Sequence, residues 1–226
     1  MRGFVKFIAA LSITMLLMLM FRALFFTVYK VSNSSLEPQF IRGDRILVNK
    51  CSYGLRTGED TNFGYSRWLK QDINKGDITA FNYPIDTLQN ISTNPVYVGV
   101  CSALPGDTVY VNSSFSLIVP GKDITVDVTE QNAILFCNIL RMHEHRDCYI
   151  CDGFLYVDGK QTDRIRFSKD YYWMSSFSFN AADDSRFFGF VPEDHLVGRV
   201  VMTVYSKDDD KPFLRNFRWD RFLKLL

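Results

Sequence analysis

The longest apolar run of the chain lies near its N-terminus. No charged residue interrupts positions 7–21, and after Arg22 the run resumes as far as Tyr29. As a helix, residues 7–29 would rise about 34 Å at roughly 1.5 Å per residue, which is enough to span the hydrocarbon core of a bilayer. Arg22 would lie near the far interface, where its long side chain can reach the lipid headgroups. The pattern therefore predicts one transmembrane helix.

The flanks of this run decide between an uncleaved anchor and a signal peptide that is removed. Bulky side chains, Phe25, Phe26 and Tyr29, stand where a cleavage site needs small ones, so we favour the anchor. Arg2 and Lys6 precede the run. By the positive-inside rule, the N-terminus then stays in the cytoplasm and the chain beyond the anchor lies outside it.

Beyond the anchor, the apolar positions follow the two-residue period of β-strands. Short runs that alternate or are fully apolar, bounded by glycine, proline or polar residues, occur at 46–49, 78–83, 96–102, 154–157 and 197–205. These runs predict a mainly β fold.

One part of the chain breaks this pattern into still shorter stretches. Residues 108–152 carry brief alternating runs and a Pro-Gly break at 120–121, so we expect a smaller β region inserted into the larger one. The expected domains are the cytoplasmic N-terminus and anchor at 1–30, a β core made of 31–107 and 153–210, and this inserted region.

Composition and charge limit the classes of molecule that the chain is expected to bind. The chain has 226 residues and a formal net charge of +1, which argues against a nucleic-acid binder with its clustered basic face. Its 20 Phe, 11 Tyr and 3 Trp suit either contact with lipid headgroups or an aromatic-rich β core. The tail at 211–226 mixes aromatic side chains with lysine and arginine, as membrane-surface segments do. Membrane lipid is therefore an expected partner.

Five cysteines follow the anchor, and two of them lie three residues apart. Cys148 and Cys151 could form a small disulfide in an oxidising compartment. Together with His143 and His145 they are four residues of zinc-ligand type. Their spacing is much tighter than that of paired-knuckle sites, so we favour a disulfide or free thiols and expect no metal or other cofactor. The third histidine, His195, is expected in a surface turn.

Ser35 is the candidate nucleophile. It ends a small polar segment, 32–35, that follows the apolar run and precedes Pro38, whose ring restricts the turn. A serine hydroxyl becomes an effective nucleophile only when a neighbouring group takes its proton. Serines in turns are common, so the significance of Ser35 depends on the rest of the chain.

Four short blocks follow in a fixed order: Ser-Leu-Glu-Pro at 35–38, Lys-Gly-Asp at 75–77, Leu-Pro-Gly-Asp at 104–107 and Asp-Ser-Arg at 184–186. Together they make the chain resemble the type I signal peptidase family, from about residue 21 to residue 199. The resemblance implies a serine endopeptidase that removes signal peptides from exported preproteins. It also implies a single-pass protein of the bacterial cytoplasmic (inner) membrane, with a signal-peptidase-like β core on the extracytoplasmic side.

The resemblance assigns roles to individual residues. Ser35 stands at the nucleophile position, and its backbone N–H would be one oxyanion donor. Asn33 replaces a serine that supplies the second donor, and its amide can donate as well. Asp184 and Arg186 belong to the supporting scaffold. A glycan on Asn33 would obstruct this site, which favours a bacterial host.

The resemblance also indicates that the general base and the residues that support it have been replaced. The family's general base is a lysine five residues before the leucine of the Leu-Pro-Gly-Asp block, and here that position is Gly99. Ala182 stands where a serine orients the lysine, and Ser-Phe-Ser at 176–178 replaces Gly-Asp-Asn. Mutually dependent catalytic positions have changed while the scaffold blocks remain. We expect Ser35, Gly99 and Ala182 to lie close together.

Three functions are open at this point. The favoured hypothesis is a pseudoenzyme, a silent or impaired relative that binds signal-peptide-like chains or a partner signal peptidase. The second is a working signal peptidase that uses Ser35 with an unidentified or partner-supplied base. The third is a zinc-dependent role of residues 143–151.

Overall fold

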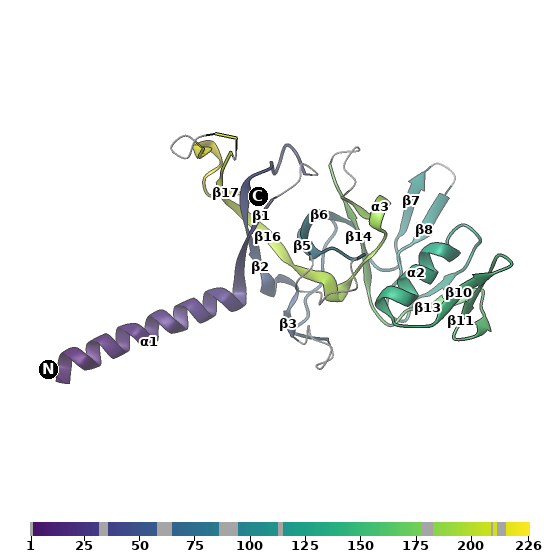
Figure 1. Ribbon diagram of the computed structural model, residues 1–226, viewed down its shortest axis with the longest axis horizontal. Coiled ribbons are helices and arrows are strands. Elements are labelled where there is room, and N and C mark those ends of the chain that lie inside the picture. The colour runs from purple at the N-terminus through teal and green to yellow at the C-terminus, as the bar shows by residue number, and fades with distance from the viewer. Residues whose placement is uncertain are drawn as a thin grey trace.

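The computed structural model describes residues 2–31, 36–57, 65–85, 95–112, 115–177, 183–208, 210–211 and 216–226. Helix α1, Arg2–Phe25, extends away from the rest of the molecule (Figure 1). It contains Gly3–Met20, an apolar stretch of 18 residues that is not buried and is long enough to cross a membrane. Length and apolar composition therefore make α1 a candidate membrane span.

Helix α1 ends at Phe25 rather than at Tyr29, where the apolar run ends. Phe26–Lys30 forms strand β1, which pairs antiparallel with β2, Asp44–Asn49. Threonine, valine and tyrosine at 27–29 favour extended backbone, and pairing with β2 satisfies their backbone groups. The prediction that the helix continues to Tyr29 was wrong, because the end of the apolar run belongs to the sheet.

An antiparallel sheet of eight strands forms the centre of the molecule. The strand order is β1-β2-β16-β5-β6-β14-β15, with β17 paired to β16. The strands not yet defined are β5 Ile78–Asn82, β6 Val96–Ala103, β14 Tyr171–Ser175, β15 Val191–Pro192, β16 Leu196–Ser206 and β17 Lys224–Leu225. The sheet and α1 confirm the predicted mainly β fold preceded by one apolar helix.

Between β6 and β14 the chain forms a separate group of short elements, at the end of the molecule far from α1 (Figure 1). These are β7 Thr108–Asn112, β8 Phe115–Ile118, β9 Thr125–Asp127, α2 Ala133–His143, β10 Cys148–Cys151, β11 Phe154–Val157, β12 Lys160–Gln161 and β13 Arg164–Arg166. The remaining short elements are β3 Leu55–Thr57, β4 Ser66–Trp68 and α3 Ser185–Phe188.

Helix α2 lies where the sequence pattern predicted only short strands. Its buried residues Ala133, Phe136, Cys137 and Leu140 follow the three-and-four spacing of a helix. They face an apolar cluster that includes Leu155 of β11. The stretch is only 11 residues long, so its helical period is easily read as interrupted strand alternation.

The main sheet curls, so that strands far apart in its order share one apolar cluster. This inner cluster contains residues of five strands, among them Tyr29, Ile46, Val48, Ala80, Val98 and Val200, and three loop residues, Val31, Leu36 and Phe40. A second, outer cluster contains Phe81, Tyr97, Cys101, Met174 and Phe188. Because successive residues of a strand face opposite sides, neighbours in β5 and β6 alternate between the two clusters.

The C-terminal segment is tied to the sheet by a buried ion pair. Arg221 donates to both carboxylate oxygens of Asp44, at 3.0 Å from Nε to Oδ1 and 2.6 Å from Nη2 to Oδ2. Arg221 also donates to the Gln39 carbonyl oxygen at 2.7 Å. The side chains of Arg221 and Asp44 are only 9% and 0% exposed. The pair therefore fixes the chain just before β2, whose partner is β1.

Candidate functional site

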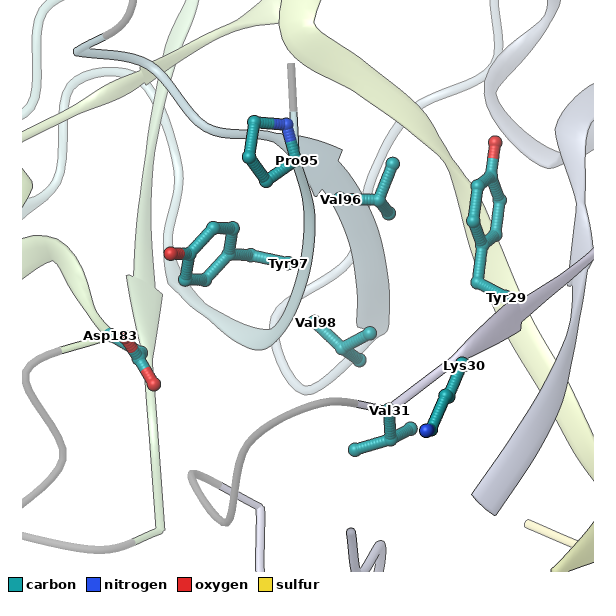
Figure 2. Close-up of a pocket in the computed structure, with 8 residues that line it drawn as sticks. All are labelled: Tyr29, Lys30, Val31, Pro95, Val96, Tyr97, Val98 and Asp183. Carbon is teal, nitrogen blue, oxygen red and sulfur yellow. The ribbon is translucent and has the colours of Figure 1, made fainter. Parts of the chain in front are cut away.

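A groove of about 410 Å³ opens between β1 and β6. The residues that line it are Tyr29, Lys30, Val31, Pro95, Val96, Tyr97, Val98 and Asp183. In Figure 2, Tyr29 and Val31 lie across from Val98, which comes from the other strand. Both walls are thus largely apolar, while Lys30 and Asp183 add one charge of each sign. The curl of the sheet creates this groove, because β1 and β6 are not neighbours in the strand order.

The two residues that flank the segment of the candidate nucleophile have different surroundings. Val31, just before it, lines the groove, and Leu36, just after it, is buried in the inner cluster. The Val31 backbone is held by Asp44, whose carbonyl oxygen accepts from the Val31 N–H at 2.8 Å. Ser35 and Asn33 themselves lie outside the described residues.

The other two predicted positions have described neighbours at the same groove. Val98 lines it and precedes Gly99 in β6, and Asp183 lines it and follows position 182. Ala182 lies outside the described residues, so the expected meeting of Ser35, Gly99 and Ala182 stays a prediction.

Gly99 is buried in the middle of β6, opposite Thr79 of β5. A Cβ at this position would lie 3.2 Å from Phe81 Cε1 and 3.3 Å from Met174 Cβ. Both neighbours belong to the outer cluster, so the space around Gly99 is apolar. A larger side chain here would require small shifts of these neighbours. An amine here would be desolvated, which lowers the pKa of a lysine.

Asp184 and Arg186 form a closed polar unit at the start of α3. Arg186 donates to Asp184 at 3.1 Å from Nε to Oδ1 and 2.7 Å from Nη2 to Oδ2. The Ser176 hydroxyl donates to Oδ2 at 3.0 Å, and the Arg186 backbone N–H donates to Oδ1 at 3.0 Å as a helix cap. Burial raises the pKa of Asp184, but these hydrogen bonds outweigh it and hold that pKa below its usual value. The unit fixes the chain that follows Asp183.

A salt bridge joins the second and third sequence blocks. Lys75 Nζ lies 2.8 Å from Asp107 Oδ2, which also accepts from the Leu104 N–H at 2.7 Å. The hydrogen bond from Lys75 lowers the pKa of Asp107. These bonds connect the start of β5 to the end of β6, the strand that carries Gly99. The scaffold blocks thus hold the strands of the site in place.

Two of the three histidines are buried against each other, where α2 meets the turn before β16. The ring centroids of His143 and His195 are 5.2 Å apart, and His195 Nδ1 lies 2.8 Å from Asp194 Oδ1. Lys169 Nζ lies 2.7 Å from Asp194 Oδ2. Burial, with a smaller contribution from His195, lowers the pKa of His143 to about 3. The prediction that His195 lies in a surface turn was wrong, because its side chain is buried.

The remaining zinc-ligand candidates point in different directions. His145 is exposed, and Cys148 and Cys151 lie on opposite faces of β10, the first buried and the second exposed. Within the described ranges, no three His, Cys, Asp or Glu residues are arranged to hold a metal ion. Strand geometry also excludes a Cys148–Cys151 disulfide. Cα atoms three residues apart in a strand are separated by about 10 Å, and a disulfide needs less than about 7 Å.

Sequence reasoning did not identify the residues that line the groove. Their one signal is position, since Tyr29–Val31 directly precede the candidate nucleophile segment and Val96–Val98 directly precede Gly99. That they face each other follows from the curl of the sheet, which no local pattern specifies.

Comparison with known proteins identifies a matching family and several similar sequences. A family described as "Signal peptidase, peptidase S26" matches residues 4–205. A probable signal peptidase I-2 of Synechocystis sp. is 26% identical over 77% of this chain and 61% of its own length. The signal peptidase I of Pseudomonas fluorescens is 25% identical over 86% of this chain and 70% of its own length. That of Aquifex aeolicus is 23% identical, with 89% and 84% covered.

Proposed function

Because this chain belongs to the signal peptidase S26 family, we propose that it holds signal-peptide-like chains in the groove between β1 and β6 without cleaving them. The observation that carries this proposal is a convergence at one groove. Val31, Val98 and Asp183, which adjoin the nucleophile segment, Gly99 and position 182 respectively, all line it. The bound chain would be the signal peptide of a preprotein, the substrate of the named relatives.

The size and lining of the groove fit a short extended peptide. A volume of about 410 Å³ accommodates a few small side chains and not a folded protein. Valine side chains at 31, 96 and 98 offer apolar surface, which suits the small apolar residues of a signal peptide near its cleavage site. For that reason we place a preprotein, rather than a partner signal peptidase, in the groove.

The proposed lack of catalytic activity follows from the absence of a general base. Amide cleavage by a serine requires a group that takes the hydroxyl proton, and a glycine at the base position has no side chain to do so. Phe81 and Met174 pack closely around Gly99, so the described surroundings of this position are largely apolar and contain no amine. Ala182 likewise has no hydroxyl to orient one.

A working enzyme is the second candidate, and Lys30 is the observation that favours it. Among the described residues that line the groove, Lys30 is the one that carries an amine. A lysine serves as a base when burial lowers its pKa, and Lys30 is exposed. We therefore rank this function below binding, and the variant Lys30→Met separates the two.

The location that we propose is the bacterial cytoplasmic membrane. Helix α1 is the candidate for a single span, and the basic residues near its start support a topology with the N-terminus inside and the sheet outside. The C-terminal segment exposes Trp219, Phe222 and Leu225, at 75%, 51% and 71%, beside several cations. Exposed aromatic and cationic side chains of this kind suit a surface that rests on lipid headgroups.

Binding to the groove is tested with the variant Val96→Arg. Val96 lines the groove and is only partly buried, so arginine can be placed there without opening the core. The charged side chain should fill the apolar groove and weaken binding of a labelled signal peptide at least about tenfold. Fluorescence anisotropy with the full-length protein in detergent micelles measures this change.

The matched control is Ile118→Arg, which makes the same kind of change at an exposed position of strand β8 in the inserted region. It should bind the peptide as the parent does. Equal affinities of the parent and Val96→Arg would place the binding site elsewhere and end this proposal.

A further inference from the structure

The inserted region brings together two cysteines that their spacing does not pair. Cys137 lies on α2 and Cys148 on β10, and these two elements pack against each other. Both side chains are buried in the same apolar cluster, at 6% and 2% exposure. After burial, Cys137 is the side chain that most raises the pKa of the Cys148 thiol, so the two thiols are neighbours within this cluster.

The chain between the two cysteines is folded back tightly. At the end of α2, the Leu140 carbonyl oxygen accepts from the N–H of Glu144 at 3.2 Å and from the N–H of Arg146 at 3.0 Å. These two hydrogen bonds to one carbonyl oxygen end the helix and reverse the direction of the chain. The reversal sends β10 along α2, so Cys148 returns to the helix face that carries Cys137.

We propose that Cys137 and Cys148 form a disulfide in the mature protein, made by a thiol–disulfide donor after the inserted region has left the cytoplasm. The two thiols form one S–S bond and give up two protons and two electrons. These reduce the S–S bond of the donor to two thiols, so the exchange balances. The proposal rests on the topology proposed above for its oxidising compartment, and it is independent of whether the groove cleaves or only binds.

The other three cysteines lie elsewhere in the fold, and Cys51 belongs to the short helix Lys50–Tyr53 that follows β2. Cys151 lies on the exposed face of β10, away from α2. Cys101 is buried in the outer cluster of the main sheet, away from the inserted region. Cys137 and Cys148 are therefore the two described cysteines that packing brings into one buried cluster, on elements in direct contact.

Burial governs when such a bond can form. Burial, reinforced by the neighbouring Cys137, raises the pKa of the Cys148 thiol to about 12. At neutral pH this thiol is protonated in the folded protein and is a poor nucleophile. The exchange therefore takes place while the region folds, and the finished bond is shielded from reductants.

Peptide mapping of the full-length protein tests the pairing. Trypsin cuts after Arg141 and Arg146, so Cys137 falls in one peptide while Cys148 and Cys151 share another. Protein refolded in a mixture of reduced and oxidised glutathione, then alkylated and digested without reductant, should yield these two peptides as one linked species. Cys151→Ser should keep the link and Cys137→Ser should remove it. A link confined to the Cys148–Cys151 peptide, or fully alkylated cysteines, would overturn the pairing.

A thermal measurement adds a readout that does not depend on mapping. Closing a ring of about a dozen residues should raise the Tm of the oxidised protein by about 5–10 °C over the reduced one. The parent and Cys151→Ser should both lose this difference on full reduction, and Cys137→Ser should never show it. An equal Tm before and after reduction in the parent would contradict the bond.

The same mapping on protein taken from bacterial membranes, alkylated during lysis, tests the compartment. We expect the linked peptide from cells as well. If the link forms in glutathione but is absent from cells, the two cysteines are close enough to pair. That result would nevertheless reject the disulfide of the mature protein and the topology on which the proposal rests. Peptide binding to the groove would be unaffected by that result.

Discussion

Replacing Arg221 by methionine is expected to lower the free energy of unfolding by about 3–5 kcal/mol. The change leaves the Asp44 carboxylate, which is 0% exposed, without its arginine partner in the interior. It also removes the bond to the Gln39 carbonyl oxygen. Equilibrium urea unfolding of the full-length protein in detergent measures the loss, and groove binding should weaken because Asp44 also holds Val31.

The matched control for this prediction is Arg166→Met. Arg166 pairs with Asp123 at 2.6 Å, but the two side chains are 65% and 67% exposed. Solvent screens such a pair, so the variant should lose less than about 1 kcal/mol. If Arg221→Met costs no more than Arg166→Met, the buried pair does not anchor the C-terminal segment.

Placing the residues that the family resemblance implies at the site is expected to produce the cleavage that, under the proposed function, the parent lacks. The full set of changes is Gly99→Lys, Ala182→Ser, Ser176→Gly, Phe177→Asp and Ser178→Asn. A positioned general base typically contributes about 10²–10⁴ in rate, so we expect at least about 100-fold more cleavage of a signal-peptide substrate than by the parent. Gly99→Lys alone should restore little, because position 182 would still carry no orienting hydroxyl.

The structure shows what a lysine at position 99 would contact. Phe81 and Met174 would surround its stem and lower its pKa by desolvation, after small shifts to relieve contacts of 3.2 and 3.3 Å. The control replaces Gly99 by methionine, which has a similar length and no amine, in the otherwise restored set. Cleavage by this control, or by the restored set with Ser35→Ala, would show that the lysine and serine do not act together.

The sequence specified the fold class because its strongest signals are local. The charge-free run predicts α1, and the strands predicted at 78–83 and 96–102 correspond within one residue to β5, Ile78–Asn82, and β6, Val96–Ala103. The end of the anchor was misplaced, because Phe26–Lys30 is apolar enough to continue a helix while its pairing with β2 makes it a strand. Apolar character alone does not separate the two.

Only those site positions that lie within a sequence block, or at a fixed distance from one, could be predicted from the sequence. Gly99 could be identified by counting back from the Leu-Pro-Gly-Asp block, but its apolar surroundings come from Phe81 and Met174 on other strands. The groove depends on a curl that brings β1 to β6, and the return of Cys148 to Cys137 depends on a helix that the pattern concealed. These are long-range pairings, and residue spacing does not encode them.

The central claim is that this family member binds but does not cleave, and one assay tests it most directly. Purified full-length protein, its Ser35→Ala variant and its Lys30→Met variant are each incubated with a fluorogenic signal-peptide substrate, in the presence of lipid and detergent. We predict no cleavage above background by any of the three, with equal peptide binding by the parent and Ser35→Ala. Cleavage by the parent that Ser35→Ala abolishes would contradict the claim, and its loss in Lys30→Met as well would identify the missing base.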